Sequence, residues 1–188
     1  MPEANDAPLE ILGLAGSLRR ASANRALLRA ASSLLPDGAR LQIAEIGDLP
    51  LYNTDLTADG PVAEVERLEA RIDAADAVLI ATPEYNYGVP GVLKNALDWA
   101  SRPAYQSVFA GKPVAIIGAS GSAVGTARAQ GQLKQVLLGM VAEPFPYPEV
   151  LVSRAGQRFQ DGELADGDTE ERLRTMLEAF VAWVRRRA

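Results

Sequence analysis

The chain has 188 residues, of which 48% are hydrophobic and 23% are charged, and its formal net charge at pH 7 is −5. This length and composition are typical of one globular domain with a sizeable core. No apolar run reaches the about 18 residues that a membrane-spanning helix needs. Because the balance of charge is acidic, we expect no nucleic acid as a partner, and we expect no membrane.

The sequence contains neither cysteine nor histidine. Without cysteine there are no disulfides, no thiol redox chemistry and no thiolate metal sites. Without histidine the chain lacks the usual general base near neutral pH and the commonest transition-metal ligand. We therefore expect no metal site, and we expect a bound cofactor to carry the difficult chemistry. Residues 1–8 do not resemble a secretory signal, so we interpret them as a flexible tail of a cytoplasmic protein.

The first half of the chain alternates strand and helix patterns. Residues 9–16 (LEILGLAG) are almost wholly apolar, which predicts a strand buried on both faces. Leucines and alanines at helical spacing follow within 24–35, and the sequence PDG ends that helix. Residues 40–46 alternate as a second strand. Gly60 and Pro61 open the next helix, and the third strand spans 76–82.

The same alternation continues in the second half. Apolar positions from Val92 to Ala100 predict a helix, and residues 112–120 (KPVAIIGAS) predict a fourth buried strand. A further helix ends near Gly139. A weaker fifth strand is predicted at 149–153.

The C-terminal segment contains two local signals. The Asp-Gly pair within 158–164 predicts a small hairpin. Asp168 and Glu171 match a capping box for a last amphipathic helix. Together, five strands alternating with five helices predict an α/β fold: a five-stranded parallel sheet in the flavodoxin-like order 2-1-3-4-5, with helices on both faces. We predict one domain at 9–188, after the N-terminal tail.

The loop after the first strand has the composition of a phosphate-binding loop. Within GSLRRASAN (16–24), Gly16 allows backbone amides to approach a ligand, and Ser17, Ser22 and Asn24 supply polar groups. Arg19 adds a guanidinium suited to phosphate, next to the N-terminus of the following helix. In the alternative interpretation, Ser22 or Asn24 only caps that helix and the arginines face water. Since neither a Walker loop nor a dinucleotide glycine pattern is present, a monophosphate is favoured.

The loop after the third strand is suited to hold a flat ring. In PEYNYG (83–88), Pro83 ends the strand, Tyr85 and Tyr87 offer aromatic faces, and Asn86 offers a donor and an acceptor. Alternatively, the tyrosines pack against the neighbouring helix and Asn86 only shapes the turn. The ring interpretation gains support because, in an α/β sheet, this loop lies at the same edge as the phosphate loop.

The loop after the fourth strand, GASGSAVGTARAQ (118–130), is rich in small residues. Ser120, Gly121, Ser122 and Gly125 leave space and backbone donors for the polar edge of a ring, although Ser120 or Ser122 also fits as a helix cap. Arg128, further along, is placed to reach the site or a partner subunit.

GSLRRASAN, PEYNYGVPGVLKNALDW and the spacing of small and polar residues from Gly118 to Leu137 resemble the NADPH-dependent FMN reductase family, including its chromate and quinone reductase members. The resemblance covers the chain from Leu9 to the last helix. It implies a flavodoxin-like fold, non-covalent FMN, NADPH or NADH as co-substrate, and a homodimer or homotetramer. It also implies electron transfer through FMN to a small-molecule acceptor: a quinone, a chromate-like oxyanion, an azo compound or free flavin.

The resemblance assigns cofactor contacts by position, and it assigns no catalytic side chain because the flavin N5 carries hydride transfer. The positions that match the phosphate-binding motif are Ser17, Arg19, Ser22 and Asn24. The positions that match the ring-binding motif are Pro83, Glu84, Tyr85, Asn86 and Tyr87, with Ser120 at the other edge of the ring.

Two positions depart from the family pattern. Gly88 stands where many members have serine, which removes a possible hydroxyl contact, and Gly125-Thr126 replaces a common Gly-Gly, which would narrow the approach to the ring. Lys94 has two interpretations, either an ion pair with Glu84 or a solvent-facing side chain.

Two rival functions fit the same fold. A flavodoxin-like electron carrier would bind FMN and dock to proteins without oxidising NAD(P)H itself. A non-catalytic oligomeric module would keep the fold but lose FMN, and the intact tyrosine-rich loop argues against it.

Overall fold

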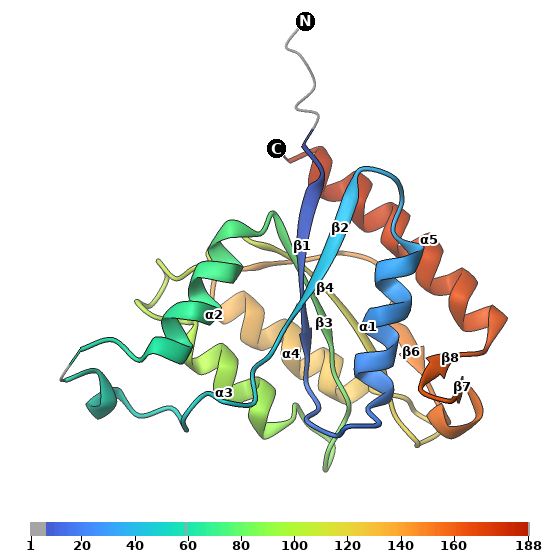
Figure 1. Cartoon of the computed structure of the whole chain (residues 1–188), viewed down its shortest axis with the longest axis horizontal. Helices are drawn as coiled ribbons and strands as arrows, with labels where there is room; N and C mark the ends of the chain where they lie inside the picture. Colours follow the sequence, from blue (N-terminus) through green and yellow to red (C-terminus); the bar gives the residue numbers. More distant parts are fainter. Residues whose placement is uncertain (1–6, 59, 188) are drawn as a thin grey trace, which may run out of the picture.

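A six-stranded parallel sheet forms the centre of the computed structural model, which describes residues 7–58 and 60–187 (Figure 1). Its strands are β1 (Leu9–Ala15), β2 (Ala39–Ala44), β3 (Ala77–Ala81), β4 (Pro113–Ala119), β5 (Glu143–Pro144) and β6 (Val150–Val152). The order is β2-β1-β3-β4-β5, and β6 also pairs with β4, which confirms the predicted flavodoxin-like order. Every residue of β3 is buried, as its unbroken apolar sequence requires in a sheet covered on both faces.

Five α-helices cover the sheet. They are α1 (Ala23–Leu34), α2 (Ala63–Ala74), α3 (Gly91–Trp99), α4 (Ala127–Gly139) and α5 (Gly167–Arg185). One buried cluster joins α1 and α5 to one face of the sheet, and a second cluster joins α2, α3 and α4 to the other. In Figure 1, α1 and α5 accordingly lie together on one side. The two-sided cover confirms the doubly wound arrangement. Because β1, β3 and β4 pair in parallel, their carboxyl ends lie at one edge of the sheet.

The edge of the sheet beyond β4 is divided between two short strands. The predicted strand at 149–153 is β6, which pairs with the second half of β4 from Ile117 onward. The first half of β4 pairs with β5, which the sequence analysis missed. β5 has only two residues, one of them Pro144, so it carries no strand periodicity.

In the C-terminal segment the predicted hairpin is confirmed, whereas the predicted cap of the last helix is wrong. The hairpin forms, with β7 (Phe159–Gln160) paired to β8 (Glu163–Leu164) after a short 3₁₀ turn, η2 (Ala155–Gln157). The predicted capping box of Asp168 and Glu171 is wrong. The cap of α5 is Asp166, whose carboxylate accepts a hydrogen bond from the N–H of Thr169 at 3.0 Å, so the helix begins one residue before Asp168.

The remaining predicted boundaries differ in detail. α2 begins at Ala63, after Gly60 and Pro61, and a 3₁₀ turn, η1 (Thr54–Thr57), precedes it. Most of the predicted tail, residues 1–6, lies outside the described residues. Within the described ranges, no helix has the length and apolar character needed to cross a membrane.

Candidate functional site

The loops after β1 and β3 lie against each other at the carboxyl edge of the sheet (Figure 1). A Cβ atom on Gly16 would meet Pro83 Cδ at 3.1 Å and Leu93 Cδ2 at 3.2 Å. The N–H of Gly16 donates to Ala81 O at 2.9 Å, so this amide continues the sheet and does not face a ligand. The glycine therefore lets the two loops pack closely, which is a different role from the predicted one.

Two side chains from these loops meet at the site. The hydroxyl groups of Ser17 and Tyr85 are 3.4 Å apart, although 68 positions separate them in sequence. Ser17 is 3% exposed, and its oxygen also accepts a hydrogen bond from the N–H of Arg19 at 3.4 Å. The loop at 16–24, called the phosphate loop below, and the loop at 83–88, called the ring loop, therefore face one shared space.

That space is a cavity of about 150 Å³. Eight of the eleven predicted site residues line it: Ser17, Arg19, Ser22, Asn24, Pro83, Glu84, Tyr85 and Ser120. Gly16, Asn86 and Tyr87 do not line it. Gly121, from the loop expected at the edge of the ring, also lines it. Three lining residues were missed by the sequence analysis, namely Ala23, Ala119 and Ala155. The first two are neighbours of predicted residues, whereas Ala155 lies in η2, where no sequence signal marks it.

The start of α1 provides the polar end of the cavity. Ser22 is the N-cap of this helix, and its hydroxyl accepts a hydrogen bond from the N–H of Arg25 at 3.2 Å. The N–H groups of Ala23 and Asn24 belong to the first helical turn, where the helix itself offers no acceptor. Arg19 is exposed beside this turn and lines the same cavity. A helix N-terminus next to a guanidinium fits a phosphate group.

Asn24 uses its side chain to join two loops. Its Nδ2 donates to the carbonyl of Ala119 at 2.8 Å, and its Oδ1 accepts from the N–H of Ala119 at 2.9 Å. The side-chain amide thereby binds the end of β4 as a neighbouring strand would. The side-chain amide of Asn24 contributes to the site by fixing the position of this loop. The backbone N–H of Asn24 is the group that remains in the first turn of α1 for a ligand.

The ring loop forms a tight turn from Tyr85 to Gly88. Tyr85 N–H donates to Gly88 O at 3.2 Å, and Gly88 N–H donates back to Tyr85 O at 3.0 Å. The two central residues, Asn86 and Tyr87, have φ angles of 48° and 69°. Two positive φ values define a type I′ turn, in which Asn is favoured and Tyr is uncommon. The left-handed positions are thus 86 and 87, and both side chains project into solvent.

Glu84 links the ring loop to α4. Its side chain is 4% exposed, and its carboxylate accepts from the backbone N–H groups of Arg128 at 3.0 Å and Ala129 at 3.1 Å. It also accepts from Nε of Arg128 at 2.6 Å. Glu84 therefore caps the N-terminus of α4 from another loop, a role that its position in PEYNYG did not indicate.

Arg128 extends this link to the tip of the turn. Its guanidinium lies 3.9 Å from the centre of the Tyr87 ring, within the range of a cation–π interaction. Gln132, one helical turn later, donates to the carbonyl of Tyr87 at 3.2 Å and accepts from the N–H of Val89 at 3.3 Å. The sequence analysis missed Gln132, because a polar residue on an exposed helix face carries no distinguishing pattern.

The environment of Glu84 lowers its pKa. Burial raises the pKa, but hydrogen bonds from Arg128 and Ala129 and the positive charge of Arg128 outweigh it, so the pKa lies below the ordinary value of 4.5. The ionised carboxylate is therefore the form that stabilises the fold. This stabilisation is complete above the unfolded-state pKa and is lost as the pH falls through the lower folded-state pKa.

We expect Glu84→Gln to lower the free energy of unfolding at pH 7 by about 1–2 kcal/mol, less than a fully buried pair because Arg128 is partly screened by water. The difference from the parent chain should shrink as the pH is lowered below about 4.5, since the parent loses the charged form. Urea unfolding at pH 7 and pH 3.5 measures both values.

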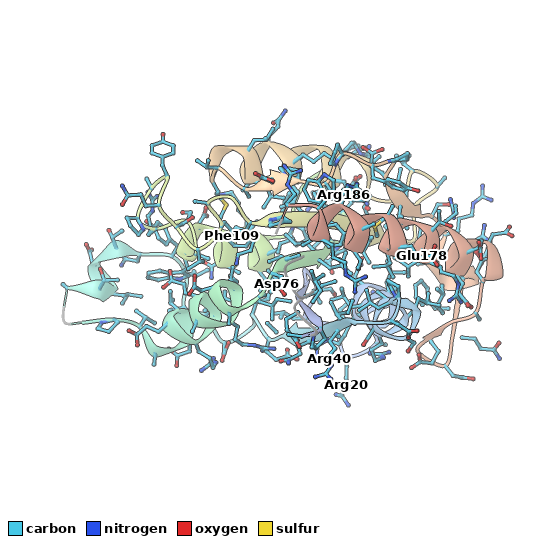
Figure 2. All side chains as sticks on the ribbon, turned by 90° about the horizontal axis from the view of Figure 1, so that it is seen from above. Arg20, Arg40, Asp76, Phe109, Glu178 and Arg186 are labelled. Carbon is cyan, nitrogen blue, oxygen red and sulfur yellow. The ribbon has the colours of Figure 1, made fainter. Side chains whose placement is uncertain are left out.

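The matched control is Glu178→Gln, a change on the exposed face of α5 (Figure 2). It should shift stability by less than about 0.5 kcal/mol at either pH. Equal effects of the two substitutions at pH 7 would remove Glu84 as the cap of α4.

The chain resembles known proteins along nearly its whole length. The profile of the NADPH-dependent FMN reductase family matches residues 9–157. The chain belongs to this family. It is 49% identical over 179 residues to the NAD(P)H-dependent FMN reductase PA1204 of Pseudomonas aeruginosa, an alignment that covers 95% of this chain and 96% of the relative. It is 45% identical over 181 residues to a 2-hydroxy-1,4-benzoquinone reductase of a Burkholderia species, covering 95% and 98%.

A solved structure agrees with the sequence relatives. FerB, a flavoenzyme NAD(P)H:(acceptor) oxidoreductase of Paracoccus denitrificans, superposes with a TM-score of 0.86 at 39% identity, covering 94% of this chain and 97% of FerB. As a member of the NADPH-dependent FMN reductase family, the chain is an oxidoreductase that uses FMN and NAD(P)H. The cavity fits this assignment, because Arg19 and the start of α1 in its lining suit a phosphate and the lining also includes the aromatic side chain of Tyr85.

The structure accounts for both departures from the family pattern. A Cβ on Gly88 would meet Gln132 Oε1 at 3.0 Å, so the glycine leaves room for the contact between the turn and α4. Thr126 is fully buried, and its Oγ1 accepts from Gln130 Nε2 at 3.0 Å. Because Thr126 points inward, the predicted narrowing of the approach to the ring is wrong.

The two remaining candidates form local contacts. Ser120 donates to the carbonyl of Gly125 at 2.7 Å and lies 2.9 Å from the hydroxyl of Ser122, so it shapes its own loop at the cavity wall. Neither serine caps α4, because the N-cap is Thr126. Lys94 pairs with Asp98 at 2.6 Å within α3 and its side chain is 45% exposed, so the interpretation as a partner of Glu84 is wrong.

Proposed function

We propose that this reductase transfers electrons from NAD(P)H through FMN to quinones, and that the cavity between the phosphate loop and the ring loop is the flavin site. The main support is the convergence of Ser17, Arg19 and the α1 N-terminus with Tyr85 around one cavity. Relatives named for quinone reduction support the acceptor class, including the 2-hydroxy-1,4-benzoquinone reductase at 45% identity.

The protein's part in the reaction is binding and orientation. Bound FMN supplies the atom that accepts and returns hydride. Arg19, Ser17 and the first-turn N–H groups of α1 would hold the phosphate. The ring loop would support one side of the flavin, with Ser120 at the opposite wall. Tyr85 is 47% exposed, so the site is open to water, and reductant and acceptor would use this open side in turn.

The visible spectrum of the purified protein tests the cofactor site. We expect flavin bands, or their appearance with fluorescence quenching when FMN is added to the flavin-free protein. Anaerobic mixing with NADPH should then bleach these bands. Bleaching that requires a separate reductase would favour the flavodoxin-like electron carrier instead. Steady-state assays with NADH and NADPH against a benzoquinone, chromate, an azo dye and free flavin define the acceptor range. We propose that chromate, the azo dye and free flavin are also reduced, each with a lower kcat/KM than the benzoquinone.

We expect Arg19→Ala to weaken FMN binding by about 1.5–3 kcal/mol, or roughly tenfold to 150-fold, the usual contribution of a hydrogen bond to a charged group. Titration of flavin-free protein with FMN, followed by fluorescence, gives the two dissociation constants. The control Arg186→Ala removes another exposed guanidinium, at the C-cap of α5 (Figure 2). If both variants bind FMN equally well, Arg19 does not contact the phosphate.

We also propose a cytoplasmic homodimer or homotetramer. Leu51 and Tyr105 are 84% and 73% exposed, and the hydrogen bond from Arg102 to the hydroxyl of Tyr52 at 2.9 Å brings their segments together. Contiguous exposed apolar side chains are typical of contact surfaces between subunits. Light scattering after size-exclusion chromatography measures the assembly, and a monomer at micromolar concentration would contradict it.

A further inference from the structure

A second cavity adjoins the flavin site at its phosphate end. It has a volume of about 350 Å³, more than twice the about 150 Å³ of the flavin cavity. The residues that line both cavities are Arg19, Ser22, Ala23, Gly121 and Ala155. Two of these, Arg19 and Ser22, belong to the phosphate loop. No residue of the 83–88 loop is among the lining residues of the second cavity, so this cavity continues from the side of the phosphate loop.

Positive charge is concentrated around this second cavity. Arg19, Arg20 and Arg29 all line it. Within residues 7–58 and 60–187, no ion pair joins Arg19 or Arg20 to an acidic side chain. Arg29 donates to the carbonyl of Gly162 at 2.6 Å and lies 3.5 Å from Glu163, which fixes it beside the hairpin of β7 and β8. Arg20 therefore adds a guanidinium beyond that of Arg19, and guanidinium groups suit phosphate oxygens, so the charge here suits a second phosphate.

The remaining walls are apolar or consist of backbone. Phe159 of β7 is half-buried at the cavity, and Ala26 and Ala155 add small apolar surfaces. Gly156 and Gly162 expose backbone at the rim. An aromatic wall with a few polar groups is typical of small-molecule pockets, stacked aromatic pairs are favourable, and arginines suit phosphate, so this lining fits a base joined to phosphate.

We propose that the second cavity receives the adenylate half of FAD, so that the protein binds FAD as well as FMN in one continuous site. FAD is FMN whose phosphate carries an additional adenosine monophosphate, and this addition begins where the flavin cavity meets the second one. Arg20 then faces the second phosphate, and the adenine packs on Phe159. The inference rests on the proposed flavin site and adds its extension toward the β7–β8 hairpin.

Titration of flavin-free protein with FMN and FAD, followed by flavin fluorescence, tests the proposal. We expect FAD to bind with a dissociation constant within about tenfold of that of FMN. Arg20→Gln should raise the dissociation constant of FAD about tenfold and leave that of FMN within twofold. Arg40→Gln is the matched control. Arg40 lies on β2 and pairs with Glu10 at the start of β1, whereas Arg20 follows the end of β1, so the two arginines lie at opposite ends of the sheet. The Arg40 substitution should change neither dissociation constant.

Each contrary result has a distinct meaning. If FMN binds and FAD does not, the extension is refuted while the proposed flavin site stands. If Arg20→Gln weakens FMN and FAD equally, Arg20 belongs to the first phosphate and the proposal is overturned. If Arg20→Gln changes neither flavin constant but raises the KM for NADPH, the cavity serves the nicotinamide dinucleotide and not FAD. Failure to bind either flavin contradicts the proposed function itself.

Discussion

Replacing Asn24 by alanine should lower the free energy of unfolding by about 3–5 kcal/mol. The side-chain amide forms two hydrogen bonds with Ala119, at 2.8 and 2.9 Å, between groups that are 3% and 2% exposed. Alanine would leave a buried N–H and a buried C=O without these partners, and each such group costs about 1–3 kcal/mol. Equilibrium urea unfolding at pH 7 measures the loss.

A matched control separates this effect from a general cost of removing asparagine. Asn53 is exposed and accepts one hydrogen bond, from the N–H of Asp55 at 3.0 Å, as the cap of η1. We expect Asn53→Ala to lower the free energy of unfolding by about 1 kcal/mol or less. FMN affinity of the Asn24 variant should also fall, because α1 and the end of β4 would no longer be held together. A loss of stability below about 1 kcal/mol would show that the two hydrogen bonds contribute little.

Gly118→Ala should destabilise the protein by about 3 kcal/mol or more, near the upper end of the usual cost of overpacking. A Cβ at this position would lie 2.2 Å from Thr126 Oγ1 and 2.4 Å from the carbonyl oxygen of Thr82. The second atom belongs to the backbone at the end of β3, so rotation of a side chain cannot relieve the contact. The ring loop or the start of α4 must then move. Thermal unfolding and FMN titration should both record the change.

Gly131→Ala provides a control with the opposite sign. Gly131 lies in α4, is exposed, and has no atom within 4 Å of the position that a Cβ would occupy. Alanine has a higher helix propensity than glycine, so this variant should be more stable by about 0.5–1 kcal/mol. If Gly118→Ala behaves in the same way, the close packing of β4 against Thr82 and Thr126 is not a constraint.

The parallel sheet and its strand order could be predicted because strands buried on both faces appear in the sequence as short, nearly continuous apolar runs. β1, β3 and β4 are short apolar runs that end in small or polar residues, and each is followed by a helix pattern. β5 was missed because a strand of two residues is too short to show the alternation of apolar and polar side chains that marks a strand. The start of α5 was misplaced because acidic residues at 166 and 168 offer competing caps, and only the fold decides which carboxylate reaches Thr169.

The candidate site was predictable as a set of loops but not as a set of contacts. Topology places the ends of neighbouring strands together, which is why the loops that carry Ser17 and Tyr85 were expected at one edge of the sheet. No local pattern shows that Glu84 turns away to cap α4, or that Asn24 binds Ala119. Such contacts depend on the distance between loops in three dimensions, and residues 44 and 95 positions apart meet in them.

The turn at the ring loop has a consequence for cofactor affinity. The protein itself restrains this turn. The restraints are its two reciprocal backbone hydrogen bonds, the guanidinium of Arg128 over Tyr87 and the hydrogen bond from the side-chain amide of Gln132. A segment restrained in this way gives up little conformational freedom when a partner arrives. In the proposed flavin site, association with flavin would therefore immobilise few additional degrees of freedom at this loop. The free energy gained from contacts with the ring would then be retained as affinity instead of being offset by ordering of the chain.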